Sequence, residues 1–245
     1  MQNHRIAIDW GNTRVKVGIF QNDNRLIFVH NFSQEEAKEK IMRIMQDRKF
    51  PPSILCSVHE NSHSLITALE DENNLLVMDS NTKVPLVNAY GTPETLGMDR
   101  LALAVGAKEA FPNQDCLIIA AGSAITYNFI QSSGFFRGGA ISPGIDMRLK
   151  SLHEYSNQLP LVEKDGYCPL IGHETATSIR SGVLYGIAAE IESMIDYYKT
   201  QYPNIKSVLT GGTVSYIHKK LKNKIHMDEA ILLRGLNAIM IHNEK

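Results

Sequence analysis

The sequence predicts an α/β protein built from two related halves. Apolar runs of strand length alternate with helical patterns, and the order of these patterns in the first half returns in the second. In each half, a turn of small residues with a glycine follows the first strand: Asp9-Trp10-Gly11 and Ala120-Ala121-Gly122. Duplication of one α/β unit explains both observations. We therefore expect two domains, residues 1–113 and residues 114–245.

The first half is expected to open with three strands and a helix. The strands are expected at residues 6–9, 15–20 and 26–30, with a fourth at 54–58. Ser33 and Glu36 have the spacing of a capping box, which starts a helix between the third and fourth strands. The predicted order is therefore β-β-β-α-β, followed by more helix.

The second half repeats this order. Strands are expected at residues 116–120, 124–130 and 135–141, with a later one at 207–209. Ser142 and Pro143 are expected to supply the N-cap and the first residue of a helix. Residues 184–198 carry an apolar stripe at helical spacing, which indicates either a core helix or a dimer surface. A terminal helix is expected around residues 231–239.

Composition and charge exclude several classes of function. The 245 residues include 25 Lys+Arg and 26 Asp+Glu, a formal net charge of −1, which argues against nucleic acid or a membrane surface as partner. The three cysteines are widely spaced and lack metal-ligand spacing. Charges among the first twenty residues exclude a signal-peptide core, and no run approaches the ~18 apolar residues of a membrane span. We expect a soluble, cytoplasmic protein.

The first candidate site is the segment from Asp9 to Lys16, with Gly11, Asn12 and Thr13 in its turn. A carboxylate at the end of a buried strand could hold hydrated Mg²⁺. Backbone N–H groups of a glycine turn, together with a lysine, could contact phosphates. The alternative is a β-hairpin with a surface aspartate. The pattern D-x-G-N-T with a lysine three residues on favours the nucleotide site.

The second candidate site comprises Tyr90 and the run Gly97-Met98-Asp99-Arg100, just before an apolar helix. The partial positive charge of the helix N-terminus is expected to keep Asp99 ionised. An ionised aspartate could accept a hydroxyl proton during phosphoryl transfer. The alternative is an ordinary acidic residue of the first turn, with Arg100 as its ion-pair partner.

Further turns of small residues give weaker signals. They are Gly122-Ser123-Ala124, Gly138-Gly139, Pro143-Gly144 and Thr210-Gly211-Gly212. Such turns let a phosphate or a nucleoside approach the backbone, but most glycine turns only reverse the chain.

Taken together in this order, these segments resemble the type III pantothenate kinases. The shared motifs are Asp9 to Lys16, Tyr90 with Gly97-Met98-Asp99-Arg100, Gly122 to Thr126, Gly138 to Gly144, Thr175 with Ser181-Gly182, and Thr210-Gly211-Gly212. The resemblance covers almost the whole chain. It implies an α/β fold of two duplicated ribonuclease H-like domains with a central cleft, the architecture of actin-like ATPases. It also implies ATP-dependent phosphorylation of pantothenate to 4′-phosphopantothenate, the first step of coenzyme A biosynthesis.

The resemblance also implies roles for individual residues. The ATP-binding residues would be Asp9, Gly11, Asn12, Thr13, Lys16 and Ser123, with Mg²⁺ held near Asp9 through water. The pantothenate-binding residues would be Tyr90, Gly97, Met98, Asp99, Arg100 and Thr175. Asp99 would be the catalytic proton acceptor. Thr175 would reach pantothenate across the interface of a homodimer.

The sequence departs from the family at a monovalent-cation site. The family's second motif begins and ends with aspartate, and the corresponding residues here are Ala120 and Asn128. The first aspartate is the family's ligand for K⁺ or NH₄⁺, and an alanine methyl group offers no oxygen to such a cation. Three outcomes are open: a kinase with weak or altered cation dependence, a slow kinase, or a non-catalytic relative that binds nucleotide or pantothenate and regulates a partner. Because Asp9 and Asp99 are present, we favour the first two.

Overall fold

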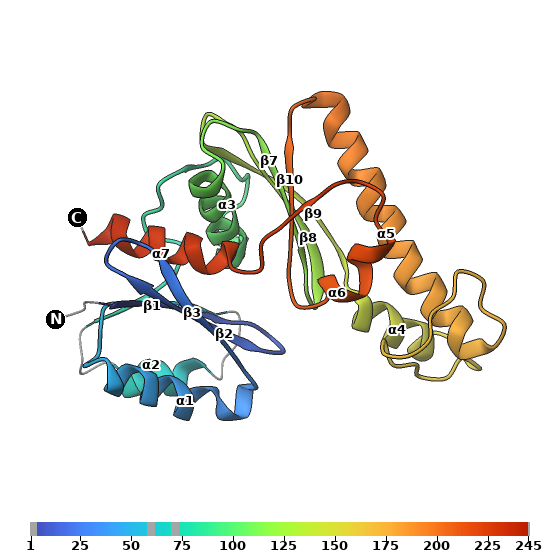
Figure 1. Ribbon diagram of the computed structural model, residues 1–245, viewed down its shortest axis with the longest axis horizontal. Helices are drawn as coiled ribbons and strands as arrows, with labels where there is room; N and C mark the ends of the chain where they lie inside the picture. The colour runs from blue at the N-terminus through green and yellow to red at the C-terminus, as the bar shows by residue number, and fades with distance from the viewer. Residues whose placement is uncertain (1–3, 58–61, 70–73, 245) are drawn as a thin grey trace. The chain divides into compact units, whose positions relative to one another are not determined.

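The computed structural model describes residues 4–57, 62–69 and 74–244 (Figure 1). The chain divides into two compact units. Unit 1 comprises Met1–Asn113, Ile130–Gly138 and Ala230–Lys245, and unit 2 comprises Gln114–Phe129 and Gly139–Glu229. In the described part of the chain, no helix combines the length and the apolar character that a bilayer crossing requires.

Unit 1 is built on a five-stranded sheet in the order β3-β2-β1-β4-β5. The strands are β1 (His4–Trp10), β2 (Val15–Gln21), β3 (Leu26–Phe32), β4 (Ser53–Ser57) and β5 (Leu75–Val77). β2 runs antiparallel to both β1 and β3, whereas β4 runs parallel to β1 and β5 parallel to β4. The four strands expected in this half are confirmed, although Val58, at the end of the expected fourth strand, lies outside the described residues.

Helices cover both faces of this sheet (Figure 1). They are α1 (Gln34–Asp47), α2 (His63–Leu69), α3 (Met98–Ala110) and α7 (Ile231–Asn243), with a short 3₁₀ turn at Pro93–Thr95. Ile6, Ile8 and Trp10 share a buried apolar cluster with residues of α1 and α2. Because successive side chains of a strand point to opposite faces, Asp9 lies on the other face, which α7 and α3 cover.

The C-terminal helix α7 packs into unit 1, although it follows unit 2 in the sequence. It lies against β1 and α3, and the two helices meet so closely that a Cβ atom on Gly235 would stand 1.8 Å from the carbonyl oxygen of Ala102. The expected domain boundary at residues 113 and 114 coincides with a boundary between the units. Residues 230–245, assigned to the second domain from the sequence, group instead with unit 1.

The second sheet has six strands in the order β11-β10-β7-β8-β9-β6. They are β6 (Val87–Asn88), β7 (Cys116–Ala121), β8 (Ala124–Ile130), β9 (Phe135–Pro143), β10 (Lys206–Thr210) and β11 (His226–Met227). The hairpin end formed by Ile130–Gly138 groups with unit 1, where β6 pairs with β9. Without β6, the second sheet read from its other edge has the order β9-β8-β7-β10-β11. In both sheets the strands are therefore arranged as the third, second, first, fourth and fifth strand of the half. This shared topology confirms the predicted duplication.

The helices of unit 2 are α4 (Ile145–Glu154), α5 (Thr175–Gln201), the short α6 (Val214–Ile217) and a 3₁₀ turn at His218–Lys220. The predicted stripe on α5 lies in the core of unit 2, where Leu184, Ile187 and Ile191 are buried. The stripe is therefore a core face rather than a dimer surface.

The expected start of the helix after β9 is wrong by two residues. Gly144 is the N-cap of α4, and Pro143 is the last residue of β9. The Ser142 hydroxyl accepts a hydrogen bond from Arg148 instead of capping the helix. The sequence pattern did not predict this, because Ser142 continues β9 and its hydroxyl group is engaged by the side chain of Arg148.

Candidate active site

Asp9 stands near the end of β1 between two neighbouring strands. Its cross-strand partner on β2 is Lys16, and its partner on β4 is Cys56. Directly paired residues of adjacent strands project to the same face of a sheet. The carboxyl group of Asp9, the ammonium group of Lys16 and the thiol of Cys56 therefore share the face that α3 and α7 cover.

The surroundings of Asp9 make its ionisation unfavourable. Burial, followed by the charge of Asp99, raises the pKa of Asp9 from 3.8 to about 7, against a lowering effect of Lys16. Burial and the charges of both aspartates likewise raise the pKa of the Cys56 thiol, which stays protonated. The charge of Asp99 thus acts on both Asp9 and Cys56 within unit 1.

Asp99 lies in the first turn of α3, as expected, but its surroundings raise its pKa rather than lower it. Burial raises its pKa, and this effect exceeds the lowering by backbone hydrogen bonds and by the charge of Arg100. The field of the helix N-terminus is thus weaker than the cost of removing the carboxylate from water. A raised pKa makes Asp99 a stronger proton acceptor once it is ionised, which suits a general base.

The turn after β1 is held by a residue that the sequence did not indicate. The Nε2 group of Gln34, the first residue of α1, donates hydrogen bonds to the carbonyl oxygens of Gly11 at 2.5 Å and Asn12 at 2.9 Å. The N–H of Gly11 is bonded to the carbonyl of Arg14, while the side chains of Asn12 and Thr13 are exposed. The turn is therefore fixed from its carbonyl side and presents Asn12 and Thr13 outward.

Tyr90 and Arg100 form a second group of site residues in unit 1. The guanidinium carbon of Arg100 lies 5.6 Å from the ring centroid of Tyr90 and 5.9 Å from that of Phe136. Arg100 is 5% exposed, so its charge is largely removed from water. Gly97 is the N-cap of α3 and Met98 its first residue. The two rings are neighbours, with centroids 6.4 Å apart, and the guanidinium group lies beside both. A guanidinium group held in this way is suited to bind a carboxylate. Phe136 was not indicated by the sequence.

The other expected site residues belong to unit 2. Ser123 is exposed in the turn between β7 and β8, and Thr175 is exposed as the first residue of α5. Ala120 is in β7, where its cross-strand partner on β10 is Thr210. Asn128 is completely buried, and its Nδ2 group donates to the carbonyl oxygen of Ile118 and to the Thr126 hydroxyl. The structure thus places Asp9, Lys16 and Asp99 in unit 1. Arg100 follows Asp99 in α3, and its guanidinium group contacts the ring of Tyr90 in the same unit.

The paired carboxyl groups fit a magnesium–nucleotide site better than a metal site made of protein alone. Among the residues that the structure describes, no group of three or more His, Cys, Asp or Glu side chains could hold a metal ion. Mg²⁺ commonly takes one or two carboxylates and completes its octahedron with water and substrate phosphates. Asp9 supplies one such carboxyl group, and Lys16, its cross-strand partner, supplies a positive charge beside it.

Solved structures share this fold. An activator of 2-hydroxyisocaproyl-CoA dehydratase from Clostridium difficile, with bound ADPNP, matches with a TM-score of 0.53 and 11% identity over 99% of this chain and 94% of that chain. A glucokinase from an Antarctic psychrotroph matches with a TM-score of 0.51 and 10% identity over 99% and 100% of the two chains. These likenesses and the duplicated strand order show a pair of ribonuclease H-like units, the fold of the actin-like ATPases and sugar kinases.

The match to a kinase family shows that the chain is a phosphotransferase. The family model for type III pantothenate kinase matches residues 5–197. A type III pantothenate kinase from Azobacteroides pseudotrichonymphae is 40% identical over 242 residues, 98% of this chain and 97% of the relative. One from Bacteroides fragilis is 40% identical over 240 residues, 97% and 98% of the two chains. The chain belongs to the type III pantothenate kinase family.

Proposed function

We propose that this protein transfers the γ-phosphoryl group of ATP to the primary hydroxyl group of pantothenate. The products are 4′-phosphopantothenate and ADP, and the reaction begins coenzyme A biosynthesis. Family membership over nearly the full chain supports this function. The observation that carries the mechanism is that Asp9 is buried under the covered face of the first sheet and feels the charge of Asp99 from the first turn of α3.

The ATP phosphates are assigned to the β1–β2 turn. Gly11, Asn12 and Thr13 would contact the phosphates, and Lys16 would contribute a positive charge close to them. Asp9 would hold Mg²⁺ through water, and the metal would neutralise charge on the phosphate oxygens when bound. Ser123, in unit 2, would contact ATP with its hydroxyl group.

Pantothenate is assigned to Tyr90, to the run from Gly97 to Arg100, and to Thr175. Arg100, buried beside Tyr90, would bind the pantothenate carboxylate. Asp99 would accept the hydroxyl proton as the hydroxyl oxygen forms its bond to phosphorus and the bond to ADP breaks. Positioning and charge stabilisation then supply most of the rate enhancement.

A coupled ADP-release assay with pantothenate tests this function. We expect Asp99→Ala and Asp99→Asn to lower kcat about 10²–10⁴-fold, because the hydroxyl proton loses its acceptor. The dissociation constant for ATP should change far less. Glu109→Gln, at the exposed C-terminal end of the same helix, is the matched control and should keep wild-type turnover. Unchanged turnover in Asp99→Ala would refute the assignment, and a wild-type protein without activity would favour a regulatory relative.

The proposal extends to the cations. Mg²⁺ is required with ATP, whereas we propose that K⁺ or NH₄⁺ has little effect on the rate. Ala120 offers no side-chain oxygen, and the carbonyl oxygen of the next residue, Ala121, already accepts hydrogen bonds from the N–H and hydroxyl groups of Thr213. A cation at this position would therefore lack the side-chain oxygen that an aspartate at residue 120 would supply.

We further propose that the protein acts as a cytoplasmic homodimer. Five apolar side chains between residues 155 and 171 of unit 2 are more than half exposed: Tyr155, Leu161, Tyr167, Leu170 and Ile171. Such a concentration of exposed apolar side chains is typical of a protein interface. Thr175 follows four residues after Ile171, so a partner seated there would lie close to a proposed pantothenate residue.

A further inference from the structure

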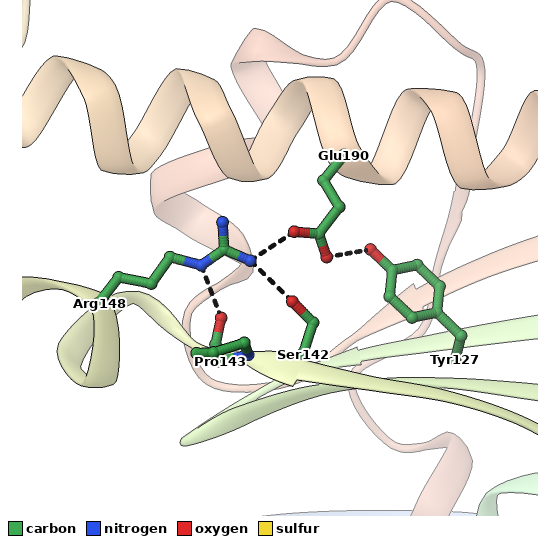
Figure 2. A network of polar contacts seen from close by, with 5 residues as sticks. All are labelled: Tyr127, Ser142, Pro143, Arg148 and Glu190. Atoms are coloured by element: carbon green, nitrogen blue, oxygen red, sulfur yellow. Dashed lines mark hydrogen bonds and ion pairs between the residues drawn. The ribbon is translucent and has the colours of Figure 1, made fainter. Parts of the chain in front are cut away.

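A network of polar contacts joins four elements of unit 2 (Figure 2). Arg148 of α4 lies at its centre: the Nε group donates to the carbonyl oxygen of Pro143 at 2.8 Å, and the Nη2 group donates to the Ser142 hydroxyl at 2.8 Å. The same Nη2 group forms an ion pair with Glu190 of α5. Glu190 also accepts a hydrogen bond of 2.9 Å from the hydroxyl group of Tyr127 on β8.

The network is charged and mostly removed from water. The side chains of Arg148 and Glu190 are 23% and 29% exposed. Burial by itself would raise the pKa of Glu190, but the hydrogen bonds from Arg148, Ser142 and Tyr127 lower it overall. Glu190 therefore stays ionised at neutral pH and keeps Arg148 in one orientation. Charge-assisted hydrogen bonds of this kind are about twice as strong as neutral ones.

Arg148 binds the carbonyl oxygens of two consecutive residues, Pro143 and Gly144. Its guanidinium group binds the carbonyl oxygen of Pro143, and its backbone N–H binds the carbonyl oxygen of Gly144 at 3.0 Å. Gly144 in turn lies directly on the turn between β7 and β8. Its N–H donates to the carbonyl oxygen of Ser123 at 3.1 Å, and a Cβ atom on Gly144 would stand 2.4 Å from the carbonyl oxygens of Gly122 and Ser123.

These contacts form a continuous path from Glu190 through Arg148 and the Pro143-Gly144 link to the backbone of Ser123. We infer that Arg148, oriented by Glu190, is a positioning residue that fixes the Ser123 turn for contact with ATP. The inference rests on the proposed role of Ser123 in binding ATP. Displacement of a site residue by ~1 Å can lower a rate about a hundredfold, so a device that holds this backbone has a functional consequence.

Measuring KM separately for ATP and for pantothenate in Arg148→Met distinguishes a positioning role from a role in protein stability alone. The methionine keeps most of the side-chain length but loses every donor to Pro143, Ser142 and Glu190. We expect KM for ATP to rise about tenfold and KM for pantothenate to stay within about twofold. Arg148→Lys, which retains the charge and part of the donor set, should recover part of this loss.

Two further variants make the test decisive. Glu192→Gln is the matched control on α5: its carboxylate binds the backbone N–H groups of Lys222 and Asn223 and does not take part in the network, so KM for ATP should stay at the wild-type value. Tyr127→Phe removes the hydrogen bond to Glu190 and should raise KM for ATP about two- to threefold. This variant keeps the inference testable if Arg148→Met does not fold.

Calorimetric titration with ADP provides a readout that does not depend on pantothenate turnover. Weaker ADP binding by Arg148→Met, together with normal binding by Glu192→Gln, supports the inference even if the proposed reaction is wrong. The inference is overturned if folded Arg148→Met binds ADP as the wild type does, if both KM values rise equally, or if Glu192→Gln has the same effect. An unaltered KM for ATP in Tyr127→Phe would also count against it.

Discussion

At the scale of residues, the pair Asp9 and Asp99 combines burial with mutual repulsion. Each effect disfavours the charged form, and the pKa of Asp9 rises to about 7 because both act on it. An apolar residue at either position would be more favourable for folding. The cost is understandable if a bound Mg²⁺–nucleotide complex supplies the missing positive charge. The two carboxyl groups are therefore expected to leave a signature in the pH dependence of stability.

Asp9→Asn is expected to become more stable relative to the wild type as the pH rises. In the folded protein Asp9 titrates at about 7, compared with the usual 3.8, so between these values the folded state holds a proton that the unfolded state has lost. Rising pH therefore destabilises the wild type. Between pH 5 and 8, without Mg²⁺, urea denaturation should show a relative change in the free energy of unfolding on the order of 3 kcal/mol.

Asp79→Asn is the control for this experiment. The pKa of Asp79 is lowered, first by a hydrogen bond from Thr82, so this residue is ionised in both states throughout the range from pH 5 to 8. The difference between Asp79→Asn and the wild type should be constant over this range. A constant difference for Asp9→Asn as well would mean that Asp9 is not held in a desolvated, repulsive environment.

Ala120 gives a second prediction at this scale. At constant ionic strength, maintained with tetramethylammonium chloride, we expect the initial rate to change less than about twofold as KCl increases, because residue 120 lacks a hard ligand. Ala120→Asp should introduce a saturable response to K⁺. A steep, saturating K⁺ requirement of the wild type would contradict the loss of this site.

At the scale of elements, α3 and α7 determine how the face of the first sheet that carries Asp9 is covered. α3 carries Asp99 in its first turn, and α7 is in backbone contact with α3 along the same face of the sheet. The two helices approach this closely because Gly106 and Gly235 have no side chains. A Cβ atom on Gly235 would also lie 2.9 Å from the backbone nitrogen of Gly106.

Gly235→Ala is expected to destabilise the protein by about 2–4 kcal/mol, because the new methyl group meets backbone atoms that must shift. Gly186→Ala, in α5, is the matched control. A Cβ atom there meets nothing within 4 Å, so the substitution should be neutral or stabilise the helix by about 0.5–1 kcal/mol. Chemical denaturation measures both. Equal stability of the two variants would mean that the helices do not depend on this contact.

At the scale of the whole molecule, the exposed apolar side chains between residues 155 and 171 are the feature that a single chain does not explain. Ile171 and Leu170 are 82% and 67% exposed. The double variant Leu170→Asp/Ile171→Asp should weaken a homodimer at least about tenfold, because burial of charge replaces burial of apolar surface. Sedimentation velocity over a range of concentrations measures this change.

Phe28→Asp is the control for the dimer experiment. Phe28 is 54% exposed on β3, in unit 1, so its replacement should leave the association unchanged. If Thr175 reaches pantothenate across the interface, the double variant should also raise KM for pantothenate. A wild-type protein that is monomeric at all concentrations, or a double variant that remains dimeric, would contradict the proposal.

Much of the fold and part of the site follow from local sequence. Strands and helices were predictable because apolar side chains recur with the period of each element, and the duplication was visible because both halves repeat one order. The motifs around Asp9 and Asp99 identified the family. A glycine turn after a strand and a carboxylate at the start of a helix are each formed by a few adjacent residues, so they can be recognised from the sequence. The predicted N-cap at Ser142 was wrong, because its hydroxyl group accepts a hydrogen bond from the side chain of Arg148 and does not cap α4.

The sequence by itself determined the element order, the duplicated α/β class, the family, and the residue types available for phosphoryl transfer. Only the tertiary structure decided that Asp99 is shifted toward its neutral form, that α7 completes the first unit, and that Gln34 and Arg148 each hold a turn. The physical reason is that periodicity and capping act over a few residues. Desolvation, cross-strand pairing and long polar contacts join residues far apart in the chain and exist only once the chain has folded.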